Sequence, residues 1–343
     1  MTDPSTQMRR EILEIPQVVA RLVTEKSQDI ARIADAARTA DPRFLVTVAR
    51  GSSDHVCTFL KYAIELELGL PVASIGPSIA SIYGAELKLA GGLCLSVSQS
   101  GKSPDIVAMT RAAGRGGALS VALTNNPGSP LALASDHTID IFAGPERSVA
   151  ATKTFITSAV SGLLMLAHWA GNDALLAALR DLPGHLDQAA QLDWPDLRRA
   201  IGQKKSLFTL GRGPSWAMSN EAALKFKETC QIHAESYSAA EVLHGPVSIV
   251  EEGFPVLCFA VGDAAEASMV SVSDDLAAKD ANVFLTSDHG TGAVRLPHVR
   301  TAHPLTDSIA LMVSFYTMVE RVAADRGVNP DTPRHLRKVT ETV

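Results

Sequence analysis

The side chains best able to do acid–base chemistry are concentrated in residues 221–246, EAALKFKETCQIHAESYSAAEVLHGP. Lys225 and Glu228 stand three residues apart, so on a helix they share one face. Glu241 and His244 repeat this spacing, and Pro246 ends the segment because proline disfavours helix in the residue before it. Acids, bases and histidines among alanines indicate a site. A solvated helix face with capping residues is the alternative interpretation.

Two loops rich in Gly and Ser have the composition of an anion site. They are ARGSSD (49–54) and SQSGKS (98–103), and each lies between a predicted strand and a predicted helix. Backbone N–H groups at a helix start, with hydroxyls and a lysine, form a receptor for a compact dianion. A single phosphate suits it better than a nucleotide, because the chain has neither a P-loop nor a GxGxxG fingerprint. Helix capping is the alternative role for the serines. The candidate side chains are Ser52, Ser53, Ser98, Gln99, Ser100, Lys102 and Ser103.

A further polar segment, VAATKTF (149–155), adds Thr152 and Lys153 at the start of the predicted buried helix 155–170. Lys153 either reaches the same pocket or extends along apolar surface to water.

The elements that position these residues follow a βαβ order. Residues 8–40 are predicted to be helical from apolar spacings of three and four. Short apolar runs that alternate with helical patterns then indicate a parallel sheet. These runs begin at FLVTVARGSSD, GGLCLSVSQSGKSPD, ALSVALTNNPGSPLA and HTIDIFAG. In such a sheet, ligands bind beyond the carboxyl ends of the strands, where the polar loops lie.

The second half repeats the first. SLFTLGRGPSW (206–216) matches FLVTVARGSSD (44–54) at an offset of 162 residues, and two further strands match in the same order. We therefore predict a duplicated α/β domain. The expected boundaries are a helical segment at 1–40, a first domain at 41–171, a helical connector at 172–200, a second domain at 201–325 and a tail at 326–343.

Composition narrows the function classes. The net charge of −6 argues against a general affinity for nucleic acid. The longest apolar helix candidate, 155–170, is too short and too polar to span a membrane. The four cysteines are scattered without a CxxC pair, which disfavours a zinc knuckle and fits reduced thiols. The amino terminus lacks the apolar core of a signal peptide, so we expect a cytoplasmic protein.

Five segments in order resemble the double sugar-isomerase (SIS) domain family, which includes the isomerase half of glucosamine-6-phosphate synthase and stand-alone glucosamine-6-phosphate deaminases. They are SVSQSGKSPD, SVAATKTF, GRG…EAALKFKE, IHAESYSAAEVLHGP and PRHLRKVTE. The resemblance covers almost the whole chain. It implies two tandem flavodoxin-like three-layer αβα domains with parallel sheets, a homodimer and no cofactor or metal.

The resemblance also implies residue roles. Glu228 matches the proton-transfer carboxylate with Lys225 beside it, and His244 matches a ring-opening histidine supplied to the neighbouring subunit. Lys338 matches a lysine that forms a Schiff base with the keto sugar, although action by charge is the alternative. Sugar and phosphate contacts fall on Ser52, Ser53, Ser98, Gln99, Ser100, Ser103, Ala150 and Thr152.

Departures from the synthase pattern favour the deaminases. Lys102 stands where the synthase has an acid, and Arg50 replaces a cysteine. The chain begins Met1-Thr2-Asp3, without the glutamine-hydrolysing domain and its amino-terminal cysteine, so we expect no amino-sugar synthesis from glutamine. We expect conversion of glucosamine 6-phosphate to fructose 6-phosphate and ammonia by ring opening, proton transfer and ketimine hydrolysis.

Three alternatives stay open from sequence. The same groups could act on galactosamine 6-phosphate or a glycated amino-acid phosphate, since such choices depend on one substituent. A non-catalytic sugar-phosphate sensor is a second, which retention of Glu228, His244 and Lys338 disfavours. A metal hydrolase using His233, Glu235, Glu241 or His244 is a third, and it lacks the PCxxC partner of the zinc deaminases. On the first reading, His233 and Glu235 belong to a loop that shapes the site.

Overall fold

The computed structural model describes residues 6–338, which divide into two compact units. Each unit is built around one five-stranded parallel sheet. The described part of the first-sheet unit comprises residues 17–146, 153–180 and 337–338. The second-sheet unit comprises residues 6–16, 147–152 and 181–336. The division falls within two long helices, α1 (Gln7–Ala40) and α6 (Asp173–Gln191).

The first sheet has the strand order β2-β1-β3-β4-β5. Its strands are β1 (Phe44–Val48), β2 (Val72–Ser74), β3 (Gly92–Val97), β4 (Leu119–Thr124) and β5 (His137–Asp140). The central strand β3 is buried at every position, as expected for a parallel strand with both faces covered.

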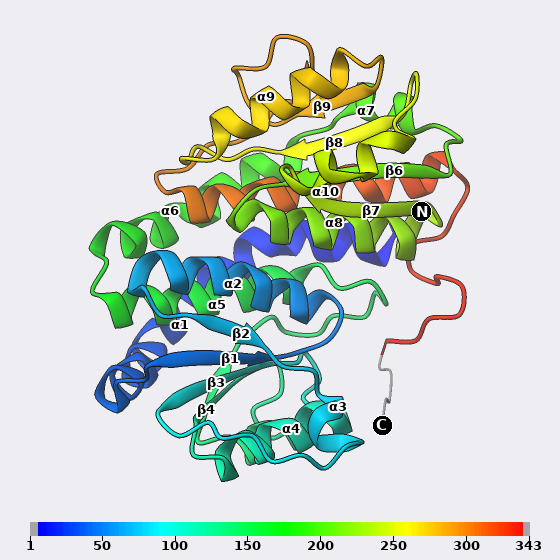
Figure 1. The fold of residues 1–343 in the computed structure, drawn as a ribbon. Coiled ribbons are helices and arrows are strands. Elements are labelled where there is room, and N and C mark those ends of the chain that lie inside the picture. Colours follow the sequence, from blue (N-terminus) through cyan, green and yellow to red (C-terminus); the bar gives the residue numbers. More distant parts are fainter. Residues whose placement is uncertain (1–5, 339–343) are drawn as a thin grey trace. The chain divides into compact units, whose positions relative to one another are not determined.

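Helices cover both faces of this first sheet (Figure 1). They are α2 (Ser52–Leu68) and α5 (Lys153–Ala170) on one face, and α4 (Pro104–Arg115) and the short α3 (Ser78–Ser81) on the other. Successive strand residues face opposite sides. Accordingly Val46 and Cys94 pack with Met109 of α4, whereas Leu45 and Leu93 line a small apolar cavity beside α2 and α5. The predicted buried helix 155–170 is confirmed, because α5 is buried from Lys153 to Ala167.

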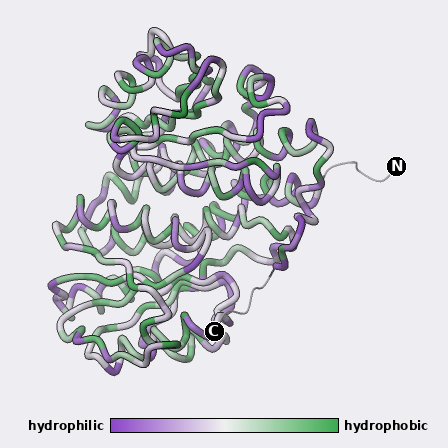
Figure 2. The backbone as a smooth tube through the Cα atoms, turned by 45° about the vertical axis from the view of Figure 1, so that its right-hand side comes forward, coloured by the Kyte–Doolittle hydropathy of each residue, from purple (hydrophilic) through white to green (hydrophobic). Residues whose placement is uncertain are grey.

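The second sheet repeats this plan in the order β7-β6-β8-β9-β10. Its strands are β6 (Ser206–Gly211), β7 (His233–Ser238), β8 (Pro255–Phe259), β9 (Asn282–Leu285) and β10 (Val294–Arg295). On one face α9 (Glu266–Ala277) packs Met269 and Leu276 against Phe208 and Cys258. On the other lie α8 (Pro214–Cys230), α7 (Pro195–Ile201) and α10 (Pro304–Asp325). In Figure 2 hydrophobic residues follow the strands of each sheet, while helices alternate in hydropathy.

The two sheets are therefore two three-layer αβα domains with the same strand order, which confirms the predicted fold class and duplication. The helices α2 and α8 begin 162 residues apart, and so do α4 and α9. Even the backbone before the first helix is repeated. Gly51 has φ 56° and ψ −135°, and Gly213 has φ 59° and ψ −135°. Positive φ of this kind is readily adopted only by glycine.

One local prediction is wrong. The segment HAES, expected to be a loop, begins strand β7 (His233–Ser238), which pairs in parallel with β6 from Ser206↔His233 onward. The run 221–246 thus consists of the end of α8, an edge strand, and the short 3₁₀ helices Glu241–His244 and Pro246–Ile249.

All four cysteines are buried and unpaired. Burial raises the pKa of Cys94 to about 11 and the pKa values of Cys230 and Cys258 to about 12. Burial also raises the pKa of Cys57. Among residues 6–338, every helix is too short or too polar to cross a bilayer.

We therefore predict that the native thiols resist aromatic disulfide reagents at pH 8. The attacking species is the thiolate, and its fraction falls tenfold for each unit by which the pKa rises. Native thiols should react roughly a hundredfold more slowly than the thiols of the urea-unfolded chain. Absorbance of the released thiol measures this rate. Rapid labelling of one thiol in the folded protein would contradict the prediction.

Candidate functional site

The loops predicted to bind phosphate follow β1 and β3, where the strand order of the first sheet reverses. In doubly wound sheets, ligands bind at the carboxyl ends of the strands at such a point. Ser52 and Ser53 begin α2 and are half-buried. The loop 98–103 leads into α4, with Ser98 buried and Gln99, Ser100 and Ser103 half-buried. The first-sheet unit thus brings these six predicted residues to one edge.

The loop 98–103 is held by its own hydroxyls. Ser98 Oγ accepts from Gly101 N at 3.2 Å, and Ser100 Oγ accepts from Lys102 N at 3.3 Å. A serine hydroxyl that accepts a bond still has its own O–H to donate, which is the polarity that a phosphate oxygen requires. Ser103 occupies the N-cap of α4 but its side chain makes no capping bond. The alternative role in capping is therefore met for the turn and not for Ser103.

Glycine is required at position 101. Its φ is +62°, and a Cβ there would lie 2.1 Å from Ser129 Oγ. Gly101 O also accepts from Leu131 N at 3.0 Å, which ties the loop to the segment after β4.

Asn125, which sequence reasoning missed, links this loop to the segment 143–146. Its backbone N–H donates to Gln99 O at 3.1 Å. Its side chain donates to Gly144 O at 2.8 Å and accepts from Ala143 N at 2.9 Å. The geometry of the phosphate-binding loop and that of segment 143–146 therefore depend on one side chain.

Lys338 ends the described chain and forms an ion pair with Glu146, another residue that sequence reasoning missed. The Nζ–Oε2 distance is 2.7 Å. Glu146 also accepts from Thr154 N at 3.0 Å and from Thr154 Oγ1 at 2.7 Å. Lys153 neither enters this pair nor reaches water, because it is buried and its Nζ donates to Pro145 O at 2.7 Å.

The remaining predicted sugar contacts, Ala150 and Thr152, are buried in the second-sheet unit. Their segment, 147–152, is fixed at its start by the Glu11 carboxylate, which accepts from Arg147 N at 2.5 Å and from Ser148 N at 3.2 Å.

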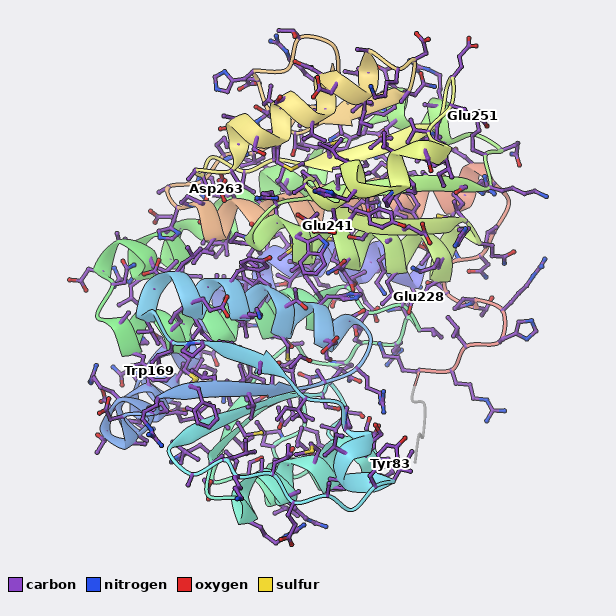
Figure 3. All side chains as sticks on the ribbon, viewed as in Figure 1. Tyr83, Trp169, Glu228, Glu241, Glu251 and Asp263 are labelled. Carbon is purple, nitrogen blue, oxygen red and sulfur yellow. The ribbon has the colours of Figure 1, made fainter. Side chains whose placement is uncertain are left out.

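The proton-transfer residues form a charged cluster on α8. Lys225 is fully buried and pairs with Glu221, four residues before it, at 3.5 Å and with Glu228, three residues after it. Glu221 is fully buried and accepts from Tyr316 Oη at 3.1 Å, whereas the Glu228 side chain is 21% exposed (Figure 3). A buried ammonium between two carboxylates favours their ionised forms. Glu221 was missed, although its i,i+4 spacing from Lys225 was a usable signal.

The other predicted groups lie beyond β7. Glu241 and His244 share one 3₁₀ helix and are exposed, Glu241 being marked in Figure 3. On β7, Tyr237 Oη donates to Glu235 at 2.6 Å, and this bond raises the pKa of Tyr237 to about 12. Within residues 6–338, no three His, Cys, Asp or Glu side chains are grouped to hold a metal ion.

Comparison with known proteins identifies the family. The SIS domain model matches residues 40–168 and 200–320, one match in each half. The chain belongs to the SIS domain family. The glutamine–fructose-6-phosphate aminotransferase (isomerizing) of Halobacterium salinarum is 31% identical over 96% of the chain, and that of Pyrobaculum aerophilum is 33% identical over 96%. The chain spans only 58% and 56% of these relatives.

Solved SIS structures agree. A candidate phosphosugar isomerase from Silicibacter pomeroyi DSS-3 is 66% identical and has a TM-score of 0.93, with 95% of this chain and 100% of that chain covered. Glucosamine-6-phosphate deaminase from Thermotoga maritima is 19% identical, with a TM-score of 0.80 over 98% of this chain and 100% of that chain, and shares the fold.

Replacing Gly101 by Ala tests the phosphate-binding loop. The left-handed backbone costs about 1–2 kcal/mol with a side chain, and the new methyl group must also displace Ser129. We expect affinity for a hexose 6-phosphate to fall at least about tenfold in calorimetric titration. Gly114→Ala in α4 is the control, because its Cβ would meet nothing within 4 Å. Equal affinity in the two variants would contradict the assignment of the loop.

Replacing Lys225 by Met tests the charged cluster. Removing one partner of a buried pair costs about 3–5 kcal/mol, because the carboxylates lose their counter-charge. Lys227→Met is the matched control, since Lys227 lies on the same helix but is exposed. We expect its effect on unfolding in urea to stay within about 1 kcal/mol. Similar losses from both variants would show that the buried cluster is not a distinct contributor to stability.

Proposed function

We propose that this protein is an aldose–ketose-type enzyme acting on an amino-sugar phosphate, and that it deaminates glucosamine 6-phosphate. The observation that carries the proposal is the α8 cluster, in which a buried lysine keeps a partly exposed carboxylate, Glu228, ionised and fixed. A phosphate-binding edge on the first sheet supplies the grip on the substrate. The SIS relatives described above support the substrate class.

The proposed reaction has three steps. His244 assists ring opening by moving a proton between ring oxygen and hydroxyl. Glu228 takes the proton from the amine-bearing carbon C2 of the open aldose and returns it to C1, which leaves a ketimine at C2. Water adds to the ketimine, and fructose 6-phosphate and ammonia leave. We further propose a homodimer in which His244 serves the neighbouring subunit.

Glu228 has the properties that this step requires. Its carboxylate is oriented by the fully buried Lys225, yet 21% of its side chain is exposed, so a substrate can reach it. A positioned carboxylate in this role contributes about 10²- to 10⁴-fold to the rate.

Ammonia release from purified protein tests the proposal. We expect release from glucosamine 6-phosphate, and a loss of about a thousandfold or more in Glu228→Gln with sugar-phosphate binding retained in calorimetry. Glu251→Gln is the control, because Glu251 is exposed on the loop before β8 (Figure 3).

Galactosamine 6-phosphate and a glycated amino-acid phosphate belong in the same assay. Release from one of them instead would change the substrate and keep the machinery. Binding without turnover of any would favour a sensor. Full activity of Glu228→Gln would overturn the proton-transfer assignment.

A further inference from the structure

Lys338 and its partner Glu146 differ in exposure. The Glu146 side chain is fully buried, whereas 24% of the Lys338 side chain is exposed. The carboxylate is also fixed from a second direction, because Thr154 donates to it through both its backbone N–H and its hydroxyl. The lysine is therefore docked onto a rigid, pre-arranged acceptor.

The charge state of this acceptor favours an ammonium. Burial alone would raise the pKa of Glu146, but Lys338 and the Thr154 donors outweigh it and hold that pKa below its ordinary value. Were Lys338 to lose its proton, the buried carboxylate would lose a cation at 2.7 Å. Buried charges that lose a close partner are strongly disfavoured.

Glu146 also lies close in the hydrogen-bond network to the phosphate-binding loop. It follows Gly144 by two residues, and Gly144 O accepts from the Asn125 side chain. The backbone of the same Asn125 donates to Gln99 O in the loop. All these residues belong to the first-sheet unit, so the position of the amine is set relative to the bound phosphate.

We propose that Glu146 is a positioning residue that holds Lys338 as an ammonium, so that Lys338 acts on the sugar by charge. This inference rests on the proposed function and decides between the two roles that the sequence leaves open for Lys338. An ammonium has no lone pair with which to attack a carbonyl. It stabilises negative charge that develops on the carbonyl oxygen as the neighbouring carbon loses its proton.

The first test is independent of turnover. Each variant is labelled at pH 8 with an amine-reactive ester, and the peptide that contains Lys338 is quantified by mass spectrometry. We expect Glu146→Gln to label at Lys338 about tenfold faster than wild type, because its neutral amide no longer favours the ammonium. The exposed Lys227 is the internal control and should not change. Equal labelling of Lys338 in both proteins would overturn the docking role of Glu146.

The second test separates charge from imine chemistry. Wild-type protein is mixed with fructose 6-phosphate and reduced with borohydride, and the intact mass is measured. We expect no adduct, and a reduced sugar adduct on Lys338 would overturn the proposal. This experiment needs only binding of the ketose phosphate, so it remains valid if deamination is not the reaction.

Variants of the lysine complete the test. Arginine keeps the positive charge and cannot form this imine, so Lys338→Arg should retain at least about a hundredth of wild-type kcat. Lys338→Met should fall well below it. Glu146→Gln should lower kcat more than it changes KM, because its effect is on the placement of Lys338. Equal inactivation by Arg and Met at position 338 would overturn action by charge.

Discussion

Strands that run parallel all end at the same edge of their sheet, and this constraint organises the molecule. Each parallel connection must cross a whole layer, so the polar residues that follow β1, β3 and β4 collect at one edge of the first sheet. Residues distant in sequence then share one network: Gln99 and Gly144 both bond to Asn125. The rigid sheet below allows short polar loops to hold a fixed geometry without a large core of their own.

Buried charges follow a common pattern in the two units. In each ion pair one member is fully buried, namely Lys225 in the second-sheet unit and Glu146 in the first-sheet unit. The other member, Glu228 or Lys338, is 21% or 24% exposed and is the group predicted to react. Burying a charge is costly unless it is paired and hydrogen-bonded. The buried member therefore fixes both the charge and the position of the exposed one, which suits a group that must be ready before substrate arrives.

Much of the fold could be predicted because its signals are local. Runs such as GLCLSV are apolar throughout, and the duplicated pattern places them twice at nearly constant spacing. The edge strand β7 was missed because HAESYS carries a polar pattern, and β10 because it has two residues. Site residues followed the same rule. Glu221 was visible from its helical spacing to Lys225, whereas Glu146 gains its partner from 192 residues away, a relation that only tertiary structure supplies.

The duplication also shows why the same edge need not bind the same ligand twice. At the offset of 162 residues, Ala260 in the second-sheet unit stands where the first has Ser98. There the Arg300 guanidinium donates to Ala260 O at 3.1 Å and to Thr286 O at 3.0 Å, at the ends of β8 and β9. It also pairs with Glu266 at 3.0 Å and with Asp307 at 3.5 Å. An arginine so engaged, among carboxylates, takes up the donors that a phosphate would use and surrounds the position with negative charge. Hydroxyls and a glycine turn at the first edge do the opposite, because they leave donors for an anion. The fold thus supplied two equivalent edges, and a few side chains made only the first suitable for a phosphate.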